Sequence, residues 1–167
     1  SIRPDQSGSY SLSPSQAALT GGGIRVEERG GGENIGYWSD PADHAAWELK
    51  HKPGKYSVDL LFAIEAGSEG STVSVSWGEQ RLGVTLSEAT GTWDSYQRLP
   101  LGFIEVGEES ERSLLLECAT RHFSWSLVMS MTPETRKLSH KKLFQNGMIF
   151  SVTDFRKFNK NIMKKND

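Results

Sequence analysis

Two segments of the chain place large aromatic side chains shortly after glycines. One runs from Gly30 to Trp38 and contains Tyr37, and the other runs from Thr90 to Tyr96 and contains Trp93. Glycine-rich turns bury little of what flanks them, so these rings are predicted to be exposed on polar loops. A planar ring offers a wide apolar surface at low entropic cost, and a pyranose presents C–H groups on its faces. The pattern therefore favours glycan contact over catalysis.

Each aromatic also has a structural interpretation. Trp93 and Tyr37 are as consistent with ordinary packing as with a ligand platform. Trp38 faces away from Tyr37 if the segment is extended, so we assign Tyr37 to a cleft and Trp38 to packing or the cleft rim. Trp125 fits either the core or the cleft. Three others lie in alternating patterns and are predicted to be core residues: Trp47, Trp77 and Tyr96.

Catalytic interpretations have less support. Cys118 and His122 do not converge as nucleophile and base on one continuing strand, and Asp43 and His44 are a loop pair that we expect to be solvated. The four histidines lack a ligand spacing such as His-Glu-x-x-His. Paired acids for glycoside cleavage need a spatial separation that a sequence does not display. We therefore predict that the chain is not an enzyme.

Charge and cysteine content limit the classes of partner. Residues 1–133 carry 10 Lys and Arg against 18 Asp and Glu, a net charge of −8, whereas residues 134–167 carry 9 against 3, a net charge of +6. An acidic body argues against nucleic acid as the main partner. The sequence lacks the apolar run of about 18 residues that would cross a membrane. The single cysteine, Cys118, excludes an internal disulfide and is predicted to be a buried small hydrophobe.

The pattern between residues 10 and 133 predicts an all-β sandwich as the scaffold of the aromatic segments. Short alternating or apolar runs are broken by Gly, Pro, Ser and Asp, and no helical period persists. Residues 1–9 are polar and are interpreted as an N-terminal linker. Two alternating sets mark strands with one buried face: Tyr56, Val58, Leu60 and Phe62, then Val73, Val75 and Trp77.

Residues 134–167 form a basic C-terminal extension with a different pattern. Thr132, Pro133 and Glu134 are typical of a helix start, and residues 148–152 of a short strand. Thr153 fits the cap of a final helix with an apolar face. A linker to a neighbouring domain, a partly helical segment and a weakly ordered extension all remain open.

Five short segments occur in the order typical of family 6 carbohydrate-binding modules, and the chain resembles that family over about residues 10–133. The variant from Tyr37 to Asp43 is similar to a related β-domain appended to α-L-fucosidases and some sulfatases. The segments that carry the resemblance are Gly21–Glu27, Asn34–Tyr37, Ala46–Leu49, Pro53–Tyr56 and Gly91–Trp93.

The resemblance implies a galactose-binding-like jelly roll with a glycan cleft among loops at one edge. Tyr37 and Trp93 would be the two rings that flank a sugar, and Glu27 would accept hydrogen bonds from its hydroxyls. The family places an asparagine before its final strand, where this chain offers His122 or Ser124 instead. Independently of the family, Asn34 is either a hydrogen-bonding ligand or a turn residue that tolerates positive φ.

The resemblance also raises the question of a structural calcium ion, which the family holds with a glutamate in the first strand and an aspartate in the last. Here residues 10–16 and 128–131 contain no carboxylate. Ca²⁺ prefers several oxygen ligands that include charged ones. We therefore predict no calcium at that site, and no other metal or cofactor.

These expectations favour a non-catalytic carbohydrate-binding module that holds a poly- or oligosaccharide and targets an attached glycan-processing enzyme. The alternative is a structural domain that buttresses a glycoside hydrolase or sulfatase domain of the same polypeptide without binding sugar. The chain shows no signal peptide and no initiator methionine, so we interpret it as a mature protein or a piece of a longer one. We expect it to be secreted, periplasmic or at the cell surface.

Overall fold

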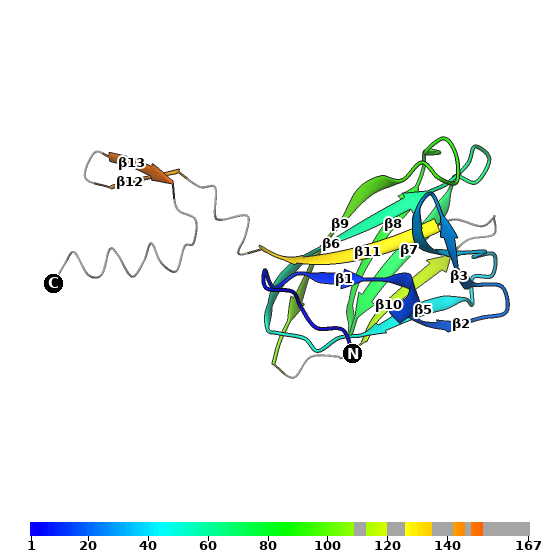
Figure 1. Cartoon of the computed structure of the whole chain (residues 1–167). Helices are drawn as coiled ribbons and strands as arrows, with labels where there is room; N and C mark the ends of the chain where they lie inside the picture. The colour runs from blue at the N-terminus through cyan, green and yellow to red at the C-terminus, as the bar shows by residue number, and fades with distance from the viewer. Residues whose placement is uncertain (109–112, 120–125, 135–141, 146–147, 152–167) are drawn as a thin grey trace. The chain divides into compact units, whose positions relative to one another are not determined.

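The computed structural model describes residues 1–108, 113–119, 126–134, 142–145 and 148–151. The chain divides into two compact units, Ser1–Thr132 and Pro133–Asp167. In the first unit, antiparallel strands form two sheets that face each other (Figure 1). The predicted all-β sandwich is therefore confirmed.

The two sheets draw their strands alternately from along the chain, as a jelly roll does. The first has the order β3-β4-β11-β6-β9, with β1 also paired to β11, and the second has the order β2-β5-β10-β7-β8. The strands of the first sheet are β1 (Tyr10–Leu12), β3 (Arg25–Arg29), β4 (Gly32–Gly36), β6 (Gly54–Ala63), β9 (Gln97–Val106) and β11 (Ser126–Pro133). Those of the second are β2 (Ala18–Thr20), β5 (His44–Glu48), β7 (Ser71–Trp77), β8 (Gln80–Leu86) and β10 (Ser113–Ala119), and a 3-10 turn, η1 (Pro14–Gln16), precedes β2.

The core lies between the sheets and follows the predicted alternation. Val58 and Leu60 of β6 are fully buried, whereas Leu61 points outward and is 38% exposed. Trp47 and Trp77 are 1% and 2% exposed and Cys118 is fully buried, so these three predictions are confirmed. The alternation leaves the odd-numbered side chains of β6 on the outer face of the first sheet.

A glutamine side chain joins the two sheets along one side of the sandwich. Gln80 Nε2 donates to Glu105 O at 2.7 Å, and Glu105 N donates to Gln80 Oε1 at 2.8 Å. The Gln80 side-chain amide thus makes the two hydrogen bonds that the backbone of a further strand would make with the edge strand β9. An edge strand closed in this way offers less unpaired backbone to other chains.

The N-terminal residues contribute to the core, which corrects the linker prediction for residues 1–9. Ile2 is 8% exposed and forms a parallel bridge with Leu49. Ile2 N donates to Glu48 O, and Lys50 N donates to Ile2 O, both at 2.8 Å. The segment is polar on average, but the sandwich buries its one large apolar side chain, Ile2.

At the helix start predicted for residues 132–134, β11 continues to Pro133 and Glu134 has 3-10 conformation, and residues 135–141 lie outside the described part of the chain. Further along, β12 (Lys142–Gln145) and β13 (Met148–Ser151) form an antiparallel hairpin, which confirms the predicted strand near residues 148–152. The final helix predicted after Thr153 lies outside the described residues. In the part of the chain that is described, no helix has the length and apolar character needed to span a bilayer.

Candidate functional site

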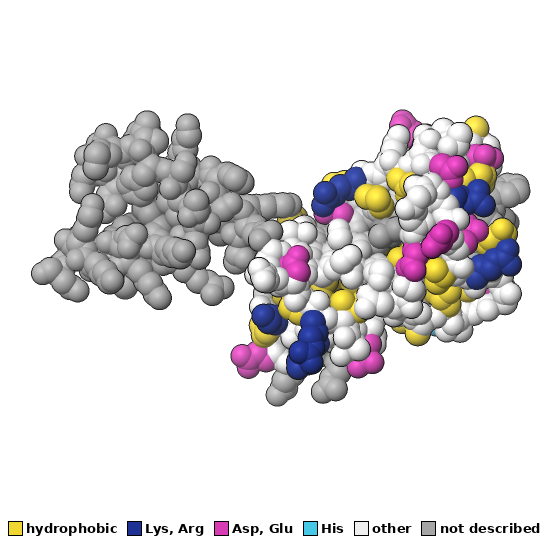
Figure 2. Space-filling view, in the orientation of Figure 1, with side chains coloured by type: hydrophobic (Ala, Val, Ile, Leu, Met, Phe, Trp, Pro, Cys, Tyr) yellow, Lys and Arg dark blue, Asp and Glu magenta, His cyan; other side chains and the backbone are white. Residues whose placement is uncertain are grey.

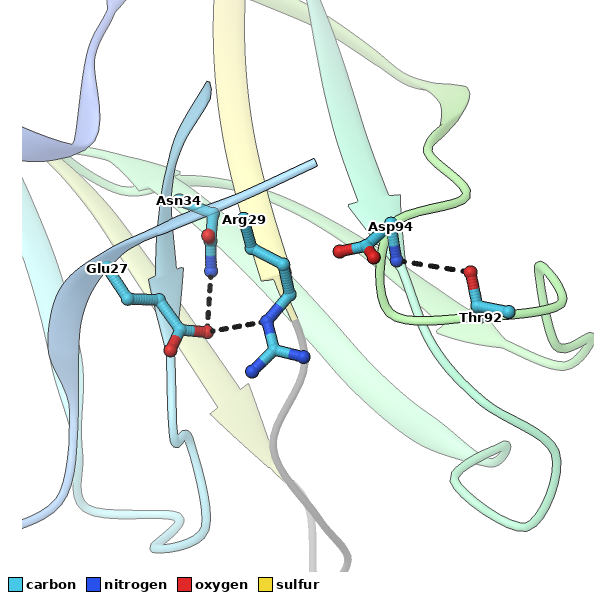
Figure 3. Close-up of polar contacts among 5 residues, drawn as sticks. All are labelled: Glu27, Arg29, Asn34, Thr92 and Asp94. Carbon is cyan, nitrogen blue, oxygen red and sulfur yellow. Dashed lines mark hydrogen bonds and ion pairs between the residues drawn. The ribbon is translucent and has the colours of Figure 1, made fainter. Parts of the chain in front are cut away.

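Three polar side chains from β3 and β4 form one hydrogen-bonded network on the outer face of the first sheet. Alternation along β3 places Glu27 and Arg29 on the same face, and Glu27 is paired in register with Asn34. Asn34 Nδ2 donates to Glu27 Oε1 at 3.1 Å, and Arg29 Nε approaches the same oxygen at 3.3 Å (Figure 3). The carboxylate is thereby held in one position by two donors.

The network depends on the absence of a side chain at Gly36. A Cβ placed there would lie 2.4 Å from Glu27 Oε1 and 3.3 Å from Asn34 Nδ2. Asn34 is fully buried and lies on a regular strand without positive φ, so its alternative interpretation as a turn residue is wrong. Glu27 retains 19% side-chain exposure, and a carboxylate oriented in this way can accept hydrogen bonds from a ligand.

Tyr37 follows the network directly and is a strained, exposed residue. Its φ is 59°, the only positive value among non-glycine residues in the described part of the chain. The Arg25 guanidinium lies over its ring at 3.5 Å from the ring centroid, and the residue is 36% exposed. Strain at an exposed ring is a feature that functional sites often carry. One face of the predicted platform is therefore occupied by a cation.

Trp38 and Asp43 show the opposite behaviour in the same loop. Trp38 is fully buried, and its Nε1 donates to Asp43 O at 3.2 Å, which agrees with its assignment to packing. Asp43 is only 2% exposed, so the prediction of a solvated pair with His44 is wrong. Its side chain occupies the space beside Gly21, where a Cβ would lie 1.9 Å from Asp43 Oδ1.

The loop that carries Trp93 is tied to the sandwich, and its ring is half-buried against the core. Ile64 N donates to Thr90 Oγ1 at 3.0 Å, and Thr90 Oγ1 donates to Ile64 O at 3.2 Å. Ser95 N donates to Thr92 O at 3.1 Å. The two bonds from Thr90 attach the loop to the sandwich, and Trp93 is less exposed than its glycine-rich context predicts.

A pocket of about 210 Å³ lies beside the network, and sequence reasoning missed it. Its walls combine the β3–β4 turn with Leu61 and Tyr96. The turn approaches Tyr96 closely, because a Cβ on Gly30 would lie 3.2 Å from Tyr96 Cε2. Tyr96, predicted to be a core residue, is half-buried. The residues that line the pocket are Arg29, Gly30, Gly31, Gly32, Glu33, Leu61 and Tyr96.

The remaining site predictions concern residues and ions that the structure does not place. His122, Ser124 and Trp125 lie outside the described residues. Among the residues that are described, no group of three or more His, Cys, Asp and Glu gathers as a metal site would require. Acidic, basic and apolar side chains are interspersed over the face of the first unit drawn in Figure 2. That face lacks the one-sign patch typical of nucleic-acid binding.

Comparison with solved structures relates this fold to carbohydrate-binding modules. The C-terminal family 6 module of a laminarinase from Zobellia galactanivorans matches with a TM-score of 0.60 and 17% identity, over 74% of this chain and 98% of that chain. A β-1,3-glucan-binding family 6 module from Bacillus halodurans matches with a TM-score of 0.58 and 20% identity, over 79% and 97%. The insecticidal crystal protein Cry2Aa matches with a TM-score of 0.62 and 15% identity, over 78% of this chain and 22% of that chain.

These comparisons establish the fold and nothing finer. The chain has the β-sandwich fold of family 6 carbohydrate-binding modules, as the resemblance implied. No family model and no curated protein sequence matches the chain. The resemblance to the domain appended to fucosidases and sulfatases stays a prediction, and so do the ligand roles of Tyr37, Trp93, Glu27 and Asn34.

Proposed function

We propose that the chain is a non-catalytic carbohydrate-binding module that binds a poly- or oligosaccharide on the outer face of β3 and β4. The observation that carries this proposal is the group of Glu27, Asn34 and Tyr37, which joins an oriented carboxylate to an exposed ring. Sugar recognition needs such a combination, since hydroxyls require acceptors and C–H faces require apolar contact.

The proposal includes an attached enzyme as partner. The laminarinase match is itself a module of a glycan-degrading enzyme. A module tethered to an enzyme raises the local concentration of substrate without doing chemistry. The proposal also includes a location outside the cell, at the cell surface or in the periplasm, where an attached enzyme would encounter polymeric glycans.

A second candidate function is favoured by two observations on the rings. Trp93 packs against the core, and the Arg25 guanidinium covers one face of Tyr37. Both would be expected of a domain that buttresses a neighbouring catalytic domain and binds no sugar. In that case Tyr37 would contact protein instead of glycan.

Calorimetric titration with soluble β-glucans, preceded by a broad glycan array on the whole chain, separates the two candidates. We expect a dissociation constant of roughly 10 μM to 1 mM. Tyr37→Ala should weaken binding roughly tenfold, because one aromatic contact is worth about 0.5–1.5 kcal/mol beyond its buried area. Val26→Ala is the matched control, since Val26 is 37% exposed on β3 and Tyr37 is 36% exposed.

Two outcomes of this experiment support opposite functions. Binding that falls for Tyr37→Ala and persists for Val26→Ala supports the module. A chain that binds no glycan on the array, while it associates with a catalytic domain in a Tyr37-dependent way, supports the buttress.

A further inference from the structure

The pocket beside the Glu27 network differs from the predicted ring platforms in shape and chemistry. Leu61 and the Tyr96 ring give it two apolar walls, and the glycines of the β3–β4 turn leave it open. A Cβ at Gly31 or Gly32 would meet nothing within 4 Å. The pocket therefore has room beside an apolar surface, which suits one ring of a saccharide.

Arg29 is the only cation among the residues that line this pocket. Glu27 Oε1 lies 3.3 Å from its Nε, and neither of its two Nη groups has a hydrogen-bond or ion-pair partner among the described residues. The side chain is 36% exposed. A guanidinium fixed through Nε still presents the pair of Nη donors that bind a planar anionic group with two parallel hydrogen bonds.

One acceptor of the pocket lining already has a donor. Glu33 is its only carboxylate, and Glu33 Oε2 accepts a hydrogen bond from Ser15 N of η1 at 3.4 Å. The Tyr96 hydroxyl is buried and has no hydrogen-bond partner in the described part of the chain. The Arg29 Nη groups are therefore the side-chain donors that the lining offers to a ligand.

We infer that this pocket binds a sugar unit that carries an anionic substituent, a carboxylate or a sulfate ester, with the Arg29 guanidinium as its specificity determinant. Arg29 pairs with the anionic oxygens, and Leu61 and the Tyr96 ring contact the sugar ring. Glu27 positions Arg29 by holding Nε. The inference rests on the proposed function, because it names the chemical class of glycan that the module selects.

The test measures binding of matched acidic and neutral oligosaccharides by calorimetry on the whole chain. One pair is a galacturonic acid trisaccharide and its methyl ester, and the other is a sulfated galactose oligosaccharide and its unsulfated form. We expect at least one acidic member to bind roughly tenfold or more tightly than its neutral partner. The pair that shows this preference distinguishes carboxylate from sulfate. Higher salt should reduce the preference.

Two variants locate the preference at Arg29. Arg29→Gln should abolish the preference for the acidic member whatever it does to neutral binding, whereas Glu33→Gln should increase the preference by removing a like charge. Arg81→Gln is the matched control, since Arg81 on β8 pairs with Glu117 at the same 3.3 Å as Arg29 with Glu27. Thermal melts of each variant verify that it is folded.

The outcomes separate this inference from the proposed function. Equal binding of acidic and neutral members, or equal effects of Arg29→Gln and Arg81→Gln, overturns the inference and leaves the module intact. An absence of binding by every saccharide, on the array and in solution, overturns both.

Discussion

The interior of the sandwich and the outer face of β3 and β4 use aromatic side chains differently. In the interior, Trp47 is 1% exposed, and its Nε1 donates to Ser13 O at 2.9 Å. On the outer face, Tyr37 is 36% exposed with a φ of 59°, and its partner is the Arg25 guanidinium. The Trp47 ring is fixed by packing and by a backbone acceptor, whereas the outer ring is held by a charged side chain at the surface.

The difference teaches that glycine content alone does not decide whether a loop aromatic is exposed. Trp38 and Tyr37 are consecutive, yet one is fully buried and the other exposed. Trp93 follows a glycine and is half-buried, because Thr90 bonds to Ile64 and draws its loop toward the core. Exposure depends on how the loop is anchored.

Trp77→Ala should produce the largest effect and would test the interior directly. Trp77 is 2% exposed and packs edge-on against His51 at a ring-centroid distance of 5.7 Å. Truncation should lower the free energy of unfolding by roughly 3–5 kcal/mol, measured by chemical denaturation. Any glycan affinity should persist in the fraction that stays folded. A loss below about 1 kcal/mol would show that this ring is not part of the core.

Trp93→Ala tests the boundary between the two regions. Its ring is half-buried, so we expect a stability loss of roughly 1–3 kcal/mol with folding retained. If Trp93 also contacts sugar, the variant should bind glycan more weakly even where it is fully folded. Calorimetry well below its melting temperature measures this affinity. Lost stability with unchanged affinity would assign Trp93 to the interior alone.

The sequence was sufficient to predict the sandwich, because burial on a strand has a period of two that residues such as Val58 and Leu60 display. It was insufficient for Ile2 and Asp43, whose burial depends on Leu49 and Gly21 from other parts of the chain. Their burial is decided by the tertiary fold, and local composition favours solvent for both.

The candidate site was predictable in part, because the period of two along a strand also applies to its polar residues. The contact between Glu27 and Arg29 follows from their positions two residues apart on one strand, a signal that our sequence reasoning did not use. The pocket was not predictable, because Tyr96 comes from a segment distant in sequence from the β3–β4 turn and meets it only in the folded chain.

Gly36→Ala tests whether the outer face is a precise arrangement. The added Cβ would lie 2.4 Å from Glu27 Oε1, so the carboxylate must shift away from Asn34. We expect a stability loss of roughly 1–3 kcal/mol, together with weaker glycan binding. Gly83→Ala is the control, since its Cβ would meet its nearest atom, Val73 O, at an ordinary 3.8 Å. Equal effects of the two substitutions would contradict a special role for Gly36.

The smallest expected effect concerns two interior tyrosines and appears only at alkaline pH. The rings of Tyr10 and Tyr56 meet edge-on at 5.7 Å. Burial, with a smaller contribution from Tyr56, raises the pKa of Tyr10 from 10.0 to about 12, and burial also raises the pKa of Tyr56. Tyr10 Oη donates to Lys50 O at 3.0 Å and accepts from Lys52 N at 3.1 Å.

The sign of the pH dependence follows from which state ionises first. Below pH 10 the hydroxyl is protonated in both states and adds no slope. Between pH 10 and about 12 the unfolded chain releases the proton while the folded chain keeps it, so stability falls as pH rises, by at most about 1.4 kcal/mol per pH unit for each group. Tyr10→Phe should therefore flatten this part of the stability curve, measured by urea unfolding at pH 9 to 11.5, at a cost of about 1 kcal/mol at neutral pH from the lost hydrogen bonds. An unchanged alkaline slope would mean that Tyr10 ionises as readily in the folded chain as in the unfolded one, and that this part of the interior admits water.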